Sequence, residues 1–418
     1  MNIRLIILSL FLFGVFNSHA QRYMTSPVAD DISTIQISAM GNWGTNPIIK
    51  LNSKEYVTLD FDRLGEYSHS RLKYNIYHCD LFWQKSKSIS EIDYLDGFNG
   101  NLIDDYKFST NTSVDYTHFK INFPNKDIKL KLSGNYLVEV YEDGDPDYIL
   151  LYACFSVVDD KVQIGAEVSS ITDIDANKGH QQLSFSINHR FNINNPSEEI
   201  LPIVRQNNRL DNQRIISKPN FVGGNKITYQ HNAHLIFEAG NEYRRFETIS
   251  RRYNGLNVDR VVYQAPYYYM DIREDKIKAD KAYSYDQDQN GRFAIRNAES
   301  SDTDTEADYF YTDFTLSVDE PLSEDIYING EFTNNTFSDK YKMVYDEDAK
   351  AYRLSLLLKQ GLYNYQYMTP NGKLYTTSLI EGQFHQTDNE YDIYVYYKPS
   401  GQRYDALIGM VKIQARAK

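Results

Sequence analysis

The amino-acid sequence predicts an all-β fold of consecutive β-sandwich domains, immunoglobulin-like or early-set-like. Apolar and polar residues alternate in short runs, as at residues 183–187 and 309–316, and this alternation is typical of strands with one buried face. Turn residues separate the runs. Asn254-Gly255, Asn290-Gly291 and Asn371-Gly372 predict hairpin turns, because Asn and Gly tolerate the positive φ that such turns require. No long helix is expected after residue 20.

The first twenty residues predict a cleaved secretory signal peptide. Arg4 supplies positive charge, residues 5–16 are almost purely apolar, and Ser18-His19-Ala20 places small residues at a cleavage site. The apolar run is too short for a comfortable membrane span, and no later segment is apolar enough to cross a bilayer. We expect cleavage after Ala20 and a mature chain that begins near Gln21. The segment contains no Cys, so a lipid anchor on an N-terminal Cys is excluded.

The strand pattern predicts a division into domains. A strand at 136–141, ended by Asp143-Gly144-Asp145-Pro146, and its hairpin partner at 148–158 close a first sandwich over residues 21–158. A middle β domain is expected over 159–298. Residues 299–308 are acidic, rich in Ser and Thr and poor in apolar residues, so they are interpreted as a linker or exposed loop. A C-terminal sandwich is expected over 309–418.

The composition excludes several functional classes. The net charge of −13 argues against binding nucleic acid or an anionic membrane surface, since both need a basic patch. Tyr is abundant, with 36 residues against 2 Trp, and suits half-buried sheets and polar interfaces. Cys79 and Cys154 are the only cysteines. They could form one disulfide or remain two buried thiols, and the sequence leaves both alternatives open.

No string of residues indicates an enzyme. The sequence contains no Gly-x-Ser-x-Gly, no His-Glu-x-x-His and no phosphate-binding loop. His231 and His234, placed on a strand, would point to opposite faces and would not share a metal ion. Tyr267-Tyr268-Tyr269 would likewise alternate between faces, which favours two-sided burial in a sheet over an adhesive patch. We therefore expect no catalytic, cofactor-binding or metal-binding residue, and no cofactor.

One acidic segment resembles half of a calcium-binding loop. Asp286-Gln287-Asp288-Gln289-Asn290-Gly291 has the alternating carboxylates of such a loop. Asn297 occupies the position where the loop needs a bidentate Glu. The segment is therefore interpreted as a polar hairpin turn, and calcium binding is left open.

Several uncommon strings follow one another along the mature chain. They are Tyr77-His78-Cys79-Asp80 with Trp83; Ser109 with Asn111-Thr112; Tyr116-Thr117-His118-Phe119; Ser133-Gly134-Asn135-Tyr136; Gln206-Asn207 with Arg209 and Asp211-Asn212; Gly240-Asn241-Glu242-Tyr243-Arg244 with Phe246; Leu358-Lys359-Gln360-Gly361 with Tyr363 and Tyr365; Tyr391 with Tyr394-Val395-Tyr396-Tyr397; and Asp405 with Leu407-Ile408-Gly409. In this order they resemble the plug protein family of the type IX secretion system. Leu210 departs from the pattern, where a Trp would be expected, and Cys154 stands in a stretch expected to be basic and aromatic.

The resemblance implies a non-enzymatic protein of the periplasm. It would bind the very large outer-membrane β-barrel translocon and close its periplasmic mouth while no substrate is exported. A compact mature chain would have a radius of gyration of about 21 Å, too broad for an ordinary porin lumen. The residues that contact the barrel and the trigger of release are not indicated. Trp83 is interpreted as a core anchor, and Tyr363 and Tyr365 share one strand face.

An alternative function comes from the third predicted domain. Its strings Tyr327-Ile328-Asn329-Gly330-Glu331-Phe332 and Met343-Val344-Tyr345-Asp346 resemble the early-set sandwich of glycogen-binding modules. Those modules usually carry a Trp that stacks on sugar, whereas this domain contains none. Phe337 or Tyr341 would have to replace it. A secreted carbohydrate-binding protein is therefore the alternative to the plug, and fold similarity alone does not decide between them.

Overall fold

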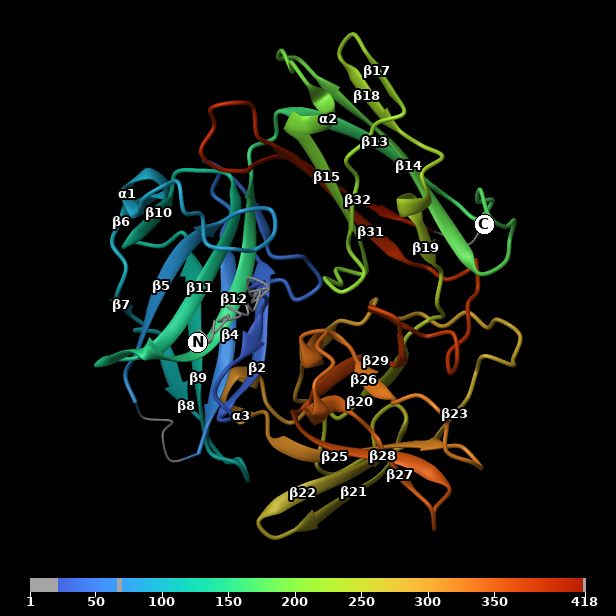
Figure 1. Cartoon of the computed structure of the whole chain (residues 1–418). Coiled ribbons are helices and arrows are strands. Elements are labelled where there is room, and N and C mark those ends of the chain that lie inside the picture. Colours follow the sequence, from blue (N-terminus) through green and yellow to red (C-terminus); the bar gives the residue numbers. More distant parts are fainter. Residues whose placement is uncertain (1–21, 66–69, 416–418) are drawn as a thin grey trace, which may run out of the picture.

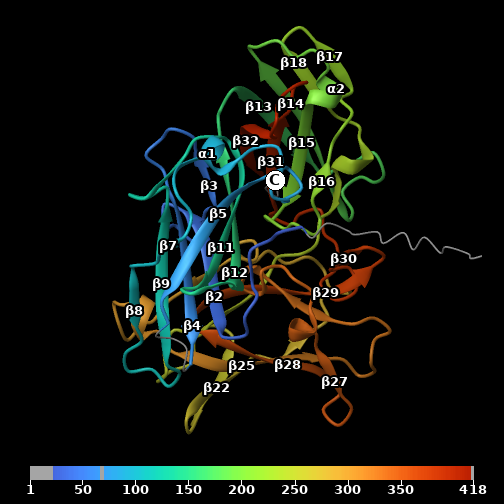
Figure 2. The ribbon, with the colours of Figure 1, turned by 60° about the vertical axis from the view of Figure 1, so that its left-hand side comes forward.

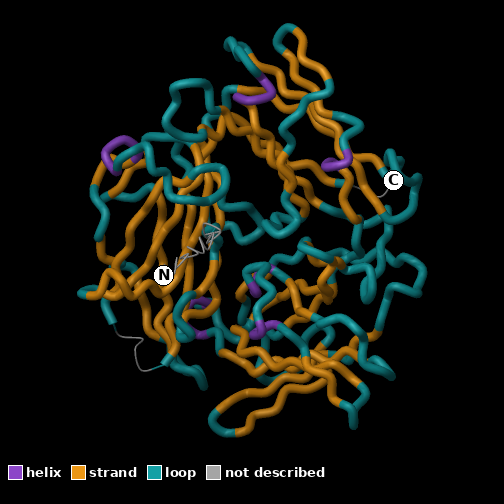
Figure 3. Tube along the Cα trace, viewed as in Figure 1, coloured by secondary structure: helices purple, strands orange, loops and turns teal. Residues whose placement is uncertain are grey.

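The computed structural model of the chain describes residues 22–65 and 70–415. The predicted signal peptide and its cleavage site lie outside the described residues. Strands dominate the described chain, and the helices are single short turns (Figure 3). The predicted all-β class is confirmed. Among the described residues, no helix has the length and apolar content needed to span a membrane.

The first body is a two-sheet sandwich. Its elements are β1 (Ser26–Pro27), β2 (Ile32–Ala39), β3 (Ile48–Lys50), β4 (Val57–Leu64), β5 (Leu72–Cys79), α1 (Glu91–Tyr94), β6 (Leu95–Gly97), β7 (Asn101–Leu102), β8 (Tyr106–Phe108), β9 (Tyr116–Phe123), β10 (Ile128–Leu130), β11 (Gly134–Glu142) and β12 (Asp145–Val158). One sheet has the order β1-β12-β11-β5-β7 and the other β2-β4-β9-β8. Apolar side chains of both, such as Phe61 and Phe155, fill the core between them. The predicted hairpin of β11 and β12 is confirmed.

The second body combines the middle of the chain with its last strands. Its elements are β13 (Val162–Ser169), β14 (His180–His189), α2 (Pro196–Glu199), β15 (Ile200–Gln206), β16 (Arg214–Ile215), β17 (Phe221–Gly223), β18 (Lys226–Tyr229), η2 (Ala233–Leu235), β19 (Ile236–Glu238), β31 (Glu390–Tyr397) and β32 (Ala406–Gln414). One sheet has the order β13-β14-β18-β17 and the other β16-β15-β31-β32. Apolar residues of both sheets, such as Phe185 and Ile393, share one core.

The third body lies between these two parts in the sequence. Its elements are β20 (Arg244–Glu247), β21 (Val258–Gln264), β22 (Tyr267–Ile272), β23 (Asp275–Lys276), β24 (Phe293–Ile295), α3 (Thr303–Glu306), β25 (Tyr309–Ser317), β26 (Tyr327–Asn329), η3 (Glu331–Thr333), η4 (Asp339–Tyr341), β27 (Val344–Asp346), β28 (Ala351–Lys359), β29 (Gly361–Asn371) and β30 (Leu374–Thr376). The sheets β20-β29-β24 and β21-β22-β25-β28-β27 enclose its core.

The sheets group the strands differently from the predicted ranges 159–298 and 309–418. β15 pairs with β31 along its whole length, so strands from both ranges form one sheet of the second body. β20 and β24, from the middle range, pair with β29 in the third body. Period-two alternation identifies a strand and its buried face, but it carries no information on a partner far away in the sequence.

Two of the three predicted hairpin turns are wrong. Gly372 does lie in the tight loop between the paired strands β29 and β30. Asn290 and Gly291 have positive φ values of 53° and 85°, but they form a turn before β24 rather than a hairpin. Gly255 is needed for another reason: a Cβ there would lie 2.0 Å from the carbonyl oxygen of Glu247. In this chain an Asn-Gly pair therefore occurs both in turns and where two backbone segments lie very close together.

The three bodies touch one another around a common centre. In Figure 1 the first body lies on the left, the second at the upper right and the third at the lower right. The view in Figure 2 shows the same triangular arrangement, with the third body below both others. The first and second bodies are joined at residues 159–161, where Asp159 N and Lys161 N donate to the carbonyl oxygens of Leu407 and Ile408.

Candidate functional site

The uncommon strings of the sequence meet at the contacts between bodies. His118 of the first body and Lys359 of the third share one buried cluster. Asn135 of the first body accepts a hydrogen bond from Tyr396 of the second. The candidate functional feature of this chain is therefore a set of polar junctions that fixes three sandwiches relative to one another.

The junction of the first and third bodies is centred on Asp62, which is 0% exposed. On β4, Leu59 and Phe61 face the core of the first body, and Asp62 faces the third body on the opposite side of the strand. His118 lies directly opposite Asp62 on β9, and its Nδ1 is 2.8 Å from Asp62 Oδ1. From the third body, Lys359 Nζ and Tyr309 Oη approach Asp62 Oδ2 at 2.7 and 2.6 Å. We call these four residues the Asp62 cluster.

The charges of the Asp62 cluster stabilise one another. Burial alone would raise the pKa of Asp62, but the Lys359 ammonium and the His118 imidazole lower it overall. Burial opposes protonation of His118, but the Asp60 carboxylate, 3.5 Å from its Nε2, and its hydrogen bond to Asp62 raise its pKa to about 9. The Lys359 ammonium also lies 4.1 Å from the ring centroid of Tyr116, a cation–π distance. The cluster therefore holds charged groups in a buried place because every charge has a partner.

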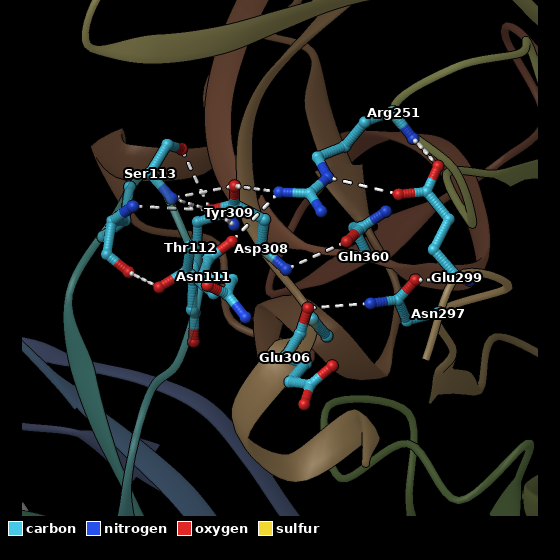
Figure 4. Close-up of polar contacts among 12 residues, drawn as sticks. Asn111, Thr112, Ser113, Arg251, Asn297, Glu299, Glu306, Asp308, Tyr309 and Gln360 are labelled. Carbon is cyan, nitrogen blue, oxygen red and sulfur yellow. Dashed lines mark hydrogen bonds and ion pairs between the residues drawn. The ribbon is translucent and has the colours of Figure 1, made fainter. Parts of the chain in front are cut away.

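A second contact of the same junction involves Asp308 (Figure 4). Its carboxylate accepts hydrogen bonds from Ser113 N and Ser113 Oγ at 2.9 Å and from Val114 N at 3.3 Å. Arg251 Nη1 donates to the carbonyl oxygen of Asn111 at 3.0 Å, and Asp308 N donates to Gln360 Oε1 at 2.9 Å. Asp308 is 0% exposed, so this end of the acidic segment binds the first body.

Residues 299–308 therefore do not form the linker or exposed loop that their composition predicts. The segment contains helix α3 and the buried Thr305. Thr110 N donates to the carbonyl oxygen of Thr305 at 2.9 Å, and Tyr116 Oη donates to that of Ala307 at 2.8 Å. Polar composition suggested exposure, but the polar groups are satisfied by another body rather than by water.

The junction of the first and second bodies uses both packing and hydrogen bonds. Leu81, Val158, Tyr394, Tyr396 and Leu407 form a shared apolar cluster. Tyr396 Oη donates to Asn135 Oδ1 at 2.8 Å, and Leu81 N donates to Asp405 Oδ2 at 3.0 Å. Gly134 permits this contact, because a Cβ at this position would lie 2.5 Å from His78 Nε2 and 3.0 Å from the carbonyl oxygen of Asp405.

All three bodies meet at a second charged cluster. Asn46 of the first body donates through Nδ2 to Asp392 Oδ2 of the second body at 2.8 Å. Arg292 of the third body lies 2.7 Å from Glu390 Oε2 and 3.1 Å from Asn46 Oδ1. Lys412 Nζ reaches the same Glu390 oxygen at 2.8 Å. The ammonium and guanidinium groups overcome burial and lower the pKa of Glu390.

The second and third bodies are joined where the chain passes twice between them, at residues 239–243 and 377–389. Asn241 Nδ2 donates to the carbonyl oxygen of Glu381 at 2.8 Å. Gly240 N donates to Gln383 Oε1 at 2.6 Å, and Thr387 Oγ1 donates to the carbonyl oxygen of Gly240 at 2.9 Å. The two passages therefore form a bonded double connection rather than two independent linkers.

The two cysteines are free and buried. Cys154 lies opposite Leu137 in β11, and Cys79 lies opposite Asn135 in the same strand. Strand β11 therefore separates them by two strand spacings, about 9.5 Å, which exceeds the Cα separation of about 7 Å that a disulfide allows. Burial raises the pKa of Cys79 to about 12 and that of Cys154 well above its usual value.

The remaining candidate residues are placed as follows. His231 and His234 do not share a strand, because His234 lies in η2 and His231 precedes it. His231 binds Asp173 at 2.9 Å. Within the described ranges, no group of three or more His, Cys, Asp or Glu is arranged to hold a metal ion. Asp288 accepts hydrogen bonds from Asn290 N and Tyr243 N, and burial raises its pKa to about 7.

Most of the aromatic residues discussed above are structural. Trp83 is 3% exposed and Tyr363 and Tyr365 lie in the core of the third body. Tyr268 faces this core, whereas Tyr269 stacks on Tyr311 at 5.2 Å. The three tyrosines alternate between the two faces of β22 as expected, but each is only partly buried, so the predicted two-sided burial is incomplete.

The two residues proposed to stack on sugar are engaged by the protein itself. Tyr341 is 6% exposed and packs in the third core. Phe337 stacks in parallel on Tyr375, with ring centroids 3.5 Å apart. One face of Phe337 is thereby covered, and Tyr341 offers no open face.

No strong signal in the sequence marks the junction residues. Asp60 and Asp62 alternate with Leu59 and Phe61 in β4, a pattern that predicts a solvent-facing side for the two carboxylates, whereas the third body covers Asp62 in the structure. Asn46 lies in a polar loop, and no signal in the sequence distinguishes it. Leu210 and Cys154, where the chain departs from the family strings, both line a cavity between the bodies.

Comparison with known proteins agrees with these features. A family model described as the first domain of the type 9 secretion system plug protein matches residues 32–159, from the start of β2 to the residue after β12. The crystal structure at 2.30 Å resolution of a hypothetical protein from Parabacteroides merdae ATCC 43184 is similar with 43% sequence identity and a TM-score of 0.91, over 94% of this chain and 100% of that chain. No curated protein matches. The first body of this chain, over residues 32–159, therefore belongs to the family of type 9 secretion system plug protein first domains.

Proposed function

We propose that this protein is a non-enzymatic periplasmic plug that binds the outer-membrane β-barrel translocon of the type 9 secretion system. It occludes the periplasmic opening of the barrel while no substrate is exported. The observation that carries the proposal is the match of the first body to the plug family. The mechanism is steric occlusion through reversible binding.

The bonded junctions support steric occlusion. Linked domains move relative to one another by default when their interfaces are small and polar. Here buried ion pairs such as Asp62 with Lys359 and Arg292 with Glu390 connect the bodies. A rigid object of this size can block a pore that passes folded proteins, whereas three flexibly linked sandwiches could thread through it one at a time.

The surface chemistry supports reversibility. The chain carries a net charge of −13, and interfaces that form and release are polar and hydrated rather than broadly apolar. Large apolar residues that are exposed, such as Phe98 and Val344, are scattered over different bodies. The partner is accordingly expected to dissociate at high ionic strength.

The first test is an affinity purification of the tagged protein from outer membranes in mild detergent, followed by mass spectrometry. The plug function expects one very large β-barrel protein in near-equal amount. Recovery of no such barrel across several gentle detergents and salt concentrations would contradict it. An immobilised glucan column tests the carbohydrate alternative, and retention that free oligosaccharide competes off would favour it.

A second test measures occlusion itself. A strain that lacks the gene is expected to take up a large hydrophilic dye, and the wild-type gene is expected to restore the barrier. Asp62→Ala, which opens the junction of the first and third bodies, should restore it poorly. Asp96→Ala serves as the matched control, because Asp96 is largely exposed. Periplasmic amounts of each variant, measured by immunoblot, separate a leaking plug from a degraded one.

A further inference from the structure

A cavity of about 100 Å³ lies where the three bodies meet. Its lining includes Ile35 and Trp83 from the first body, Arg205 and Tyr394 from the second, and Asn334 from the third. A space of this size holds several water molecules or one small organic molecule.

Apolar and aromatic residues make up a little more than half of the cavity lining, and polar residues make up the rest. Trp43 and Trp83, the only two Trp of the chain, both line it. Trp43 is 40% exposed and marks the side that opens to solvent, whereas Trp83 is 3% exposed. Met24, Ile35 and Leu210 add aliphatic surface. Such walls suit an apolar group of a few carbon atoms.

Two residues that line the cavity each carry a buried donor atom with no acceptor among the described residues. Trp83 Nε1 and Arg205 Nη2 are both buried and make no hydrogen bond there. Arg205 is 4% exposed, and its guanidinium carbon stacks 4.6 Å above the ring of Tyr394. Its Nε binds Gln213 Oε1 at 3.3 Å. Buried donors without an acceptor are rare and costly in native proteins, and the buried Arg205 cation in addition lacks an anionic partner within the described residues.

The charged residues around the cavity also favour an anionic ligand. Arg22, whose Nη1 donates to the carbonyl oxygen of Leu210 at 3.5 Å, also has two unpaired buried nitrogens among the described residues. Burial and the neighbouring Arg205 lower the pKa of Arg22 to about 10. Glu331 is the one acidic residue in the described lining. Burial raises its pKa, whereas Arg292 beside it opposes that rise.

The backbone of Trp83 is also unusual. Its φ of 62° lies in the left-handed region, which bulky residues rarely adopt. Tyr23 N donates to the carbonyl oxygen of Trp83 at 3.1 Å, and Trp83 N donates to that of Asp80 at 3.0 Å. These two backbone hydrogen bonds hold Trp83 in place. Its indole Nε1–H makes no hydrogen bond within the described structure. Strained conformations of this kind concentrate at binding sites.

We propose that the central cavity binds a small carboxylate that carries an apolar tail. The carboxylate pairs with the Arg205 guanidinium, which lines the cavity and has no acidic partner among the described residues. The tail lies against Trp43 and Ile35. The ligand bridges the first and second bodies and so stabilises their junction.

The test uses the intrinsic fluorescence of the two cavity tryptophans. The full mature chain is titrated with hexanoate and, as the neutral isostere, with hexanamide. We expect a saturable spectral change and a raised melting temperature with hexanoate, and no such change with hexanamide. Equal responses to both compounds, or no saturable response to hexanoate by the folded protein, would overturn the proposal.

Variants locate the site and identify the source of the carboxylate. Arg205→Met should weaken hexanoate binding at least tenfold, and Arg205→Lys should retain part of it. Arg260→Met is the matched control, because Arg260 is exposed and pairs with Asp271 at the opposite end of the third body. Unchanged affinity in folded Arg205→Met would contradict the assignment. Acetyl-Ala-Ala-Leu with a free or an amidated C-terminus then distinguishes a peptide end from a free acid.

Discussion

Lys359 Nζ lies 2.7 Å from Asp62 Oδ2, and this ion pair is buried from both sides: the side chains are 1% and 0% exposed. The two residues belong to different sandwiches, β28 of the third body and β4 of the first. Each has a cross-strand neighbour that also reaches into the contact, Tyr309 opposite Lys359 and His118 opposite Asp62. Register within each sheet therefore determines the geometry between the sheets.

Removal of one partner should destabilise the chain strongly. Lys359→Met leaves the Asp62 carboxylate buried without its ammonium, and we expect the free energy of unfolding to fall by about 3–5 kcal/mol. The double variant Asp62→Asn, Lys359→Met should recover part of the loss. Guanidinium unfolding monitored by circular dichroism measures both. Lys129→Met is the control, because Lys129 is exposed and lies 4.0 Å from Asp96; a similar loss there would refute the assigned role.

His118 should make stability depend on alkaline pH. Its folded-state pKa of about 9 lies above the ordinary value of 6.5, so protonated His118 stabilises the fold. This contribution is fully present below about pH 6.5 and is lost as the pH rises through about 9, by roughly 2–3 kcal/mol. His118→Gln should flatten the decline between pH 6.5 and 9, as measured by unfolding at several pH values. The exposed His231→Gln variant should leave the profile as in the wild type.

Gly134 should tolerate no side chain. Its φ is +138°, and an added Cβ would lie 2.5 Å from His78 Nε2. Gly134→Ala should cost roughly 2–4 kcal/mol, since backbone strain and overpacking add. Gly144→Ala separates these terms: Gly144 has a φ of +105°, but nothing lies within 4 Å of its added Cβ. Thermal unfolding should show the larger drop for Gly134→Ala, and equal drops would rule out the steric contact.

Cys79 and Cys154 should behave as two inert thiols. Burial raises the pKa of Cys79 to about 12, so little thiolate forms at neutral pH. We expect Ellman's reagent to detect almost no thiol in the native protein and two thiols per chain in 6 M guanidinium. An unreacted denatured chain whose mass rises by two hydrogens on reduction would instead demonstrate a disulfide.

Calcium should have little effect on stability. The Asp288 carboxylate, central to the acidic segment, already accepts hydrogen bonds from Asn290 N and Tyr243 N. Differential scanning fluorimetry in 1 mM calcium chloride and in 1 mM EDTA should give the same melting temperature. A higher melting temperature in calcium would show that the folded state binds the ion.

The strands themselves could be found in the sequence because their signal is local. Two largely apolar runs at residues 136–141 and 148–158 flank the turn residues 143–146, and the structure forms the β11–β12 hairpin there. Residues 309–316 form most of β25. The junctions are less accessible. Asp62, Asp308 and Arg292 resemble ordinary surface charges in sequence, and only their partners from other bodies show why they are buried.

The sequence by itself determined the β class, the individual strands and the family, because hydrophobic alternation, turn residues and ordered strings are properties of short segments. Only the tertiary structure decided that β31 joins β15 and that β20 joins β29. It also decided that the acidic segment at 299–308 binds the first body. Pairing between distant strands depends on which exposed edges and buried charges find complementary partners in three dimensions, and a period of two residues is the same for every candidate partner.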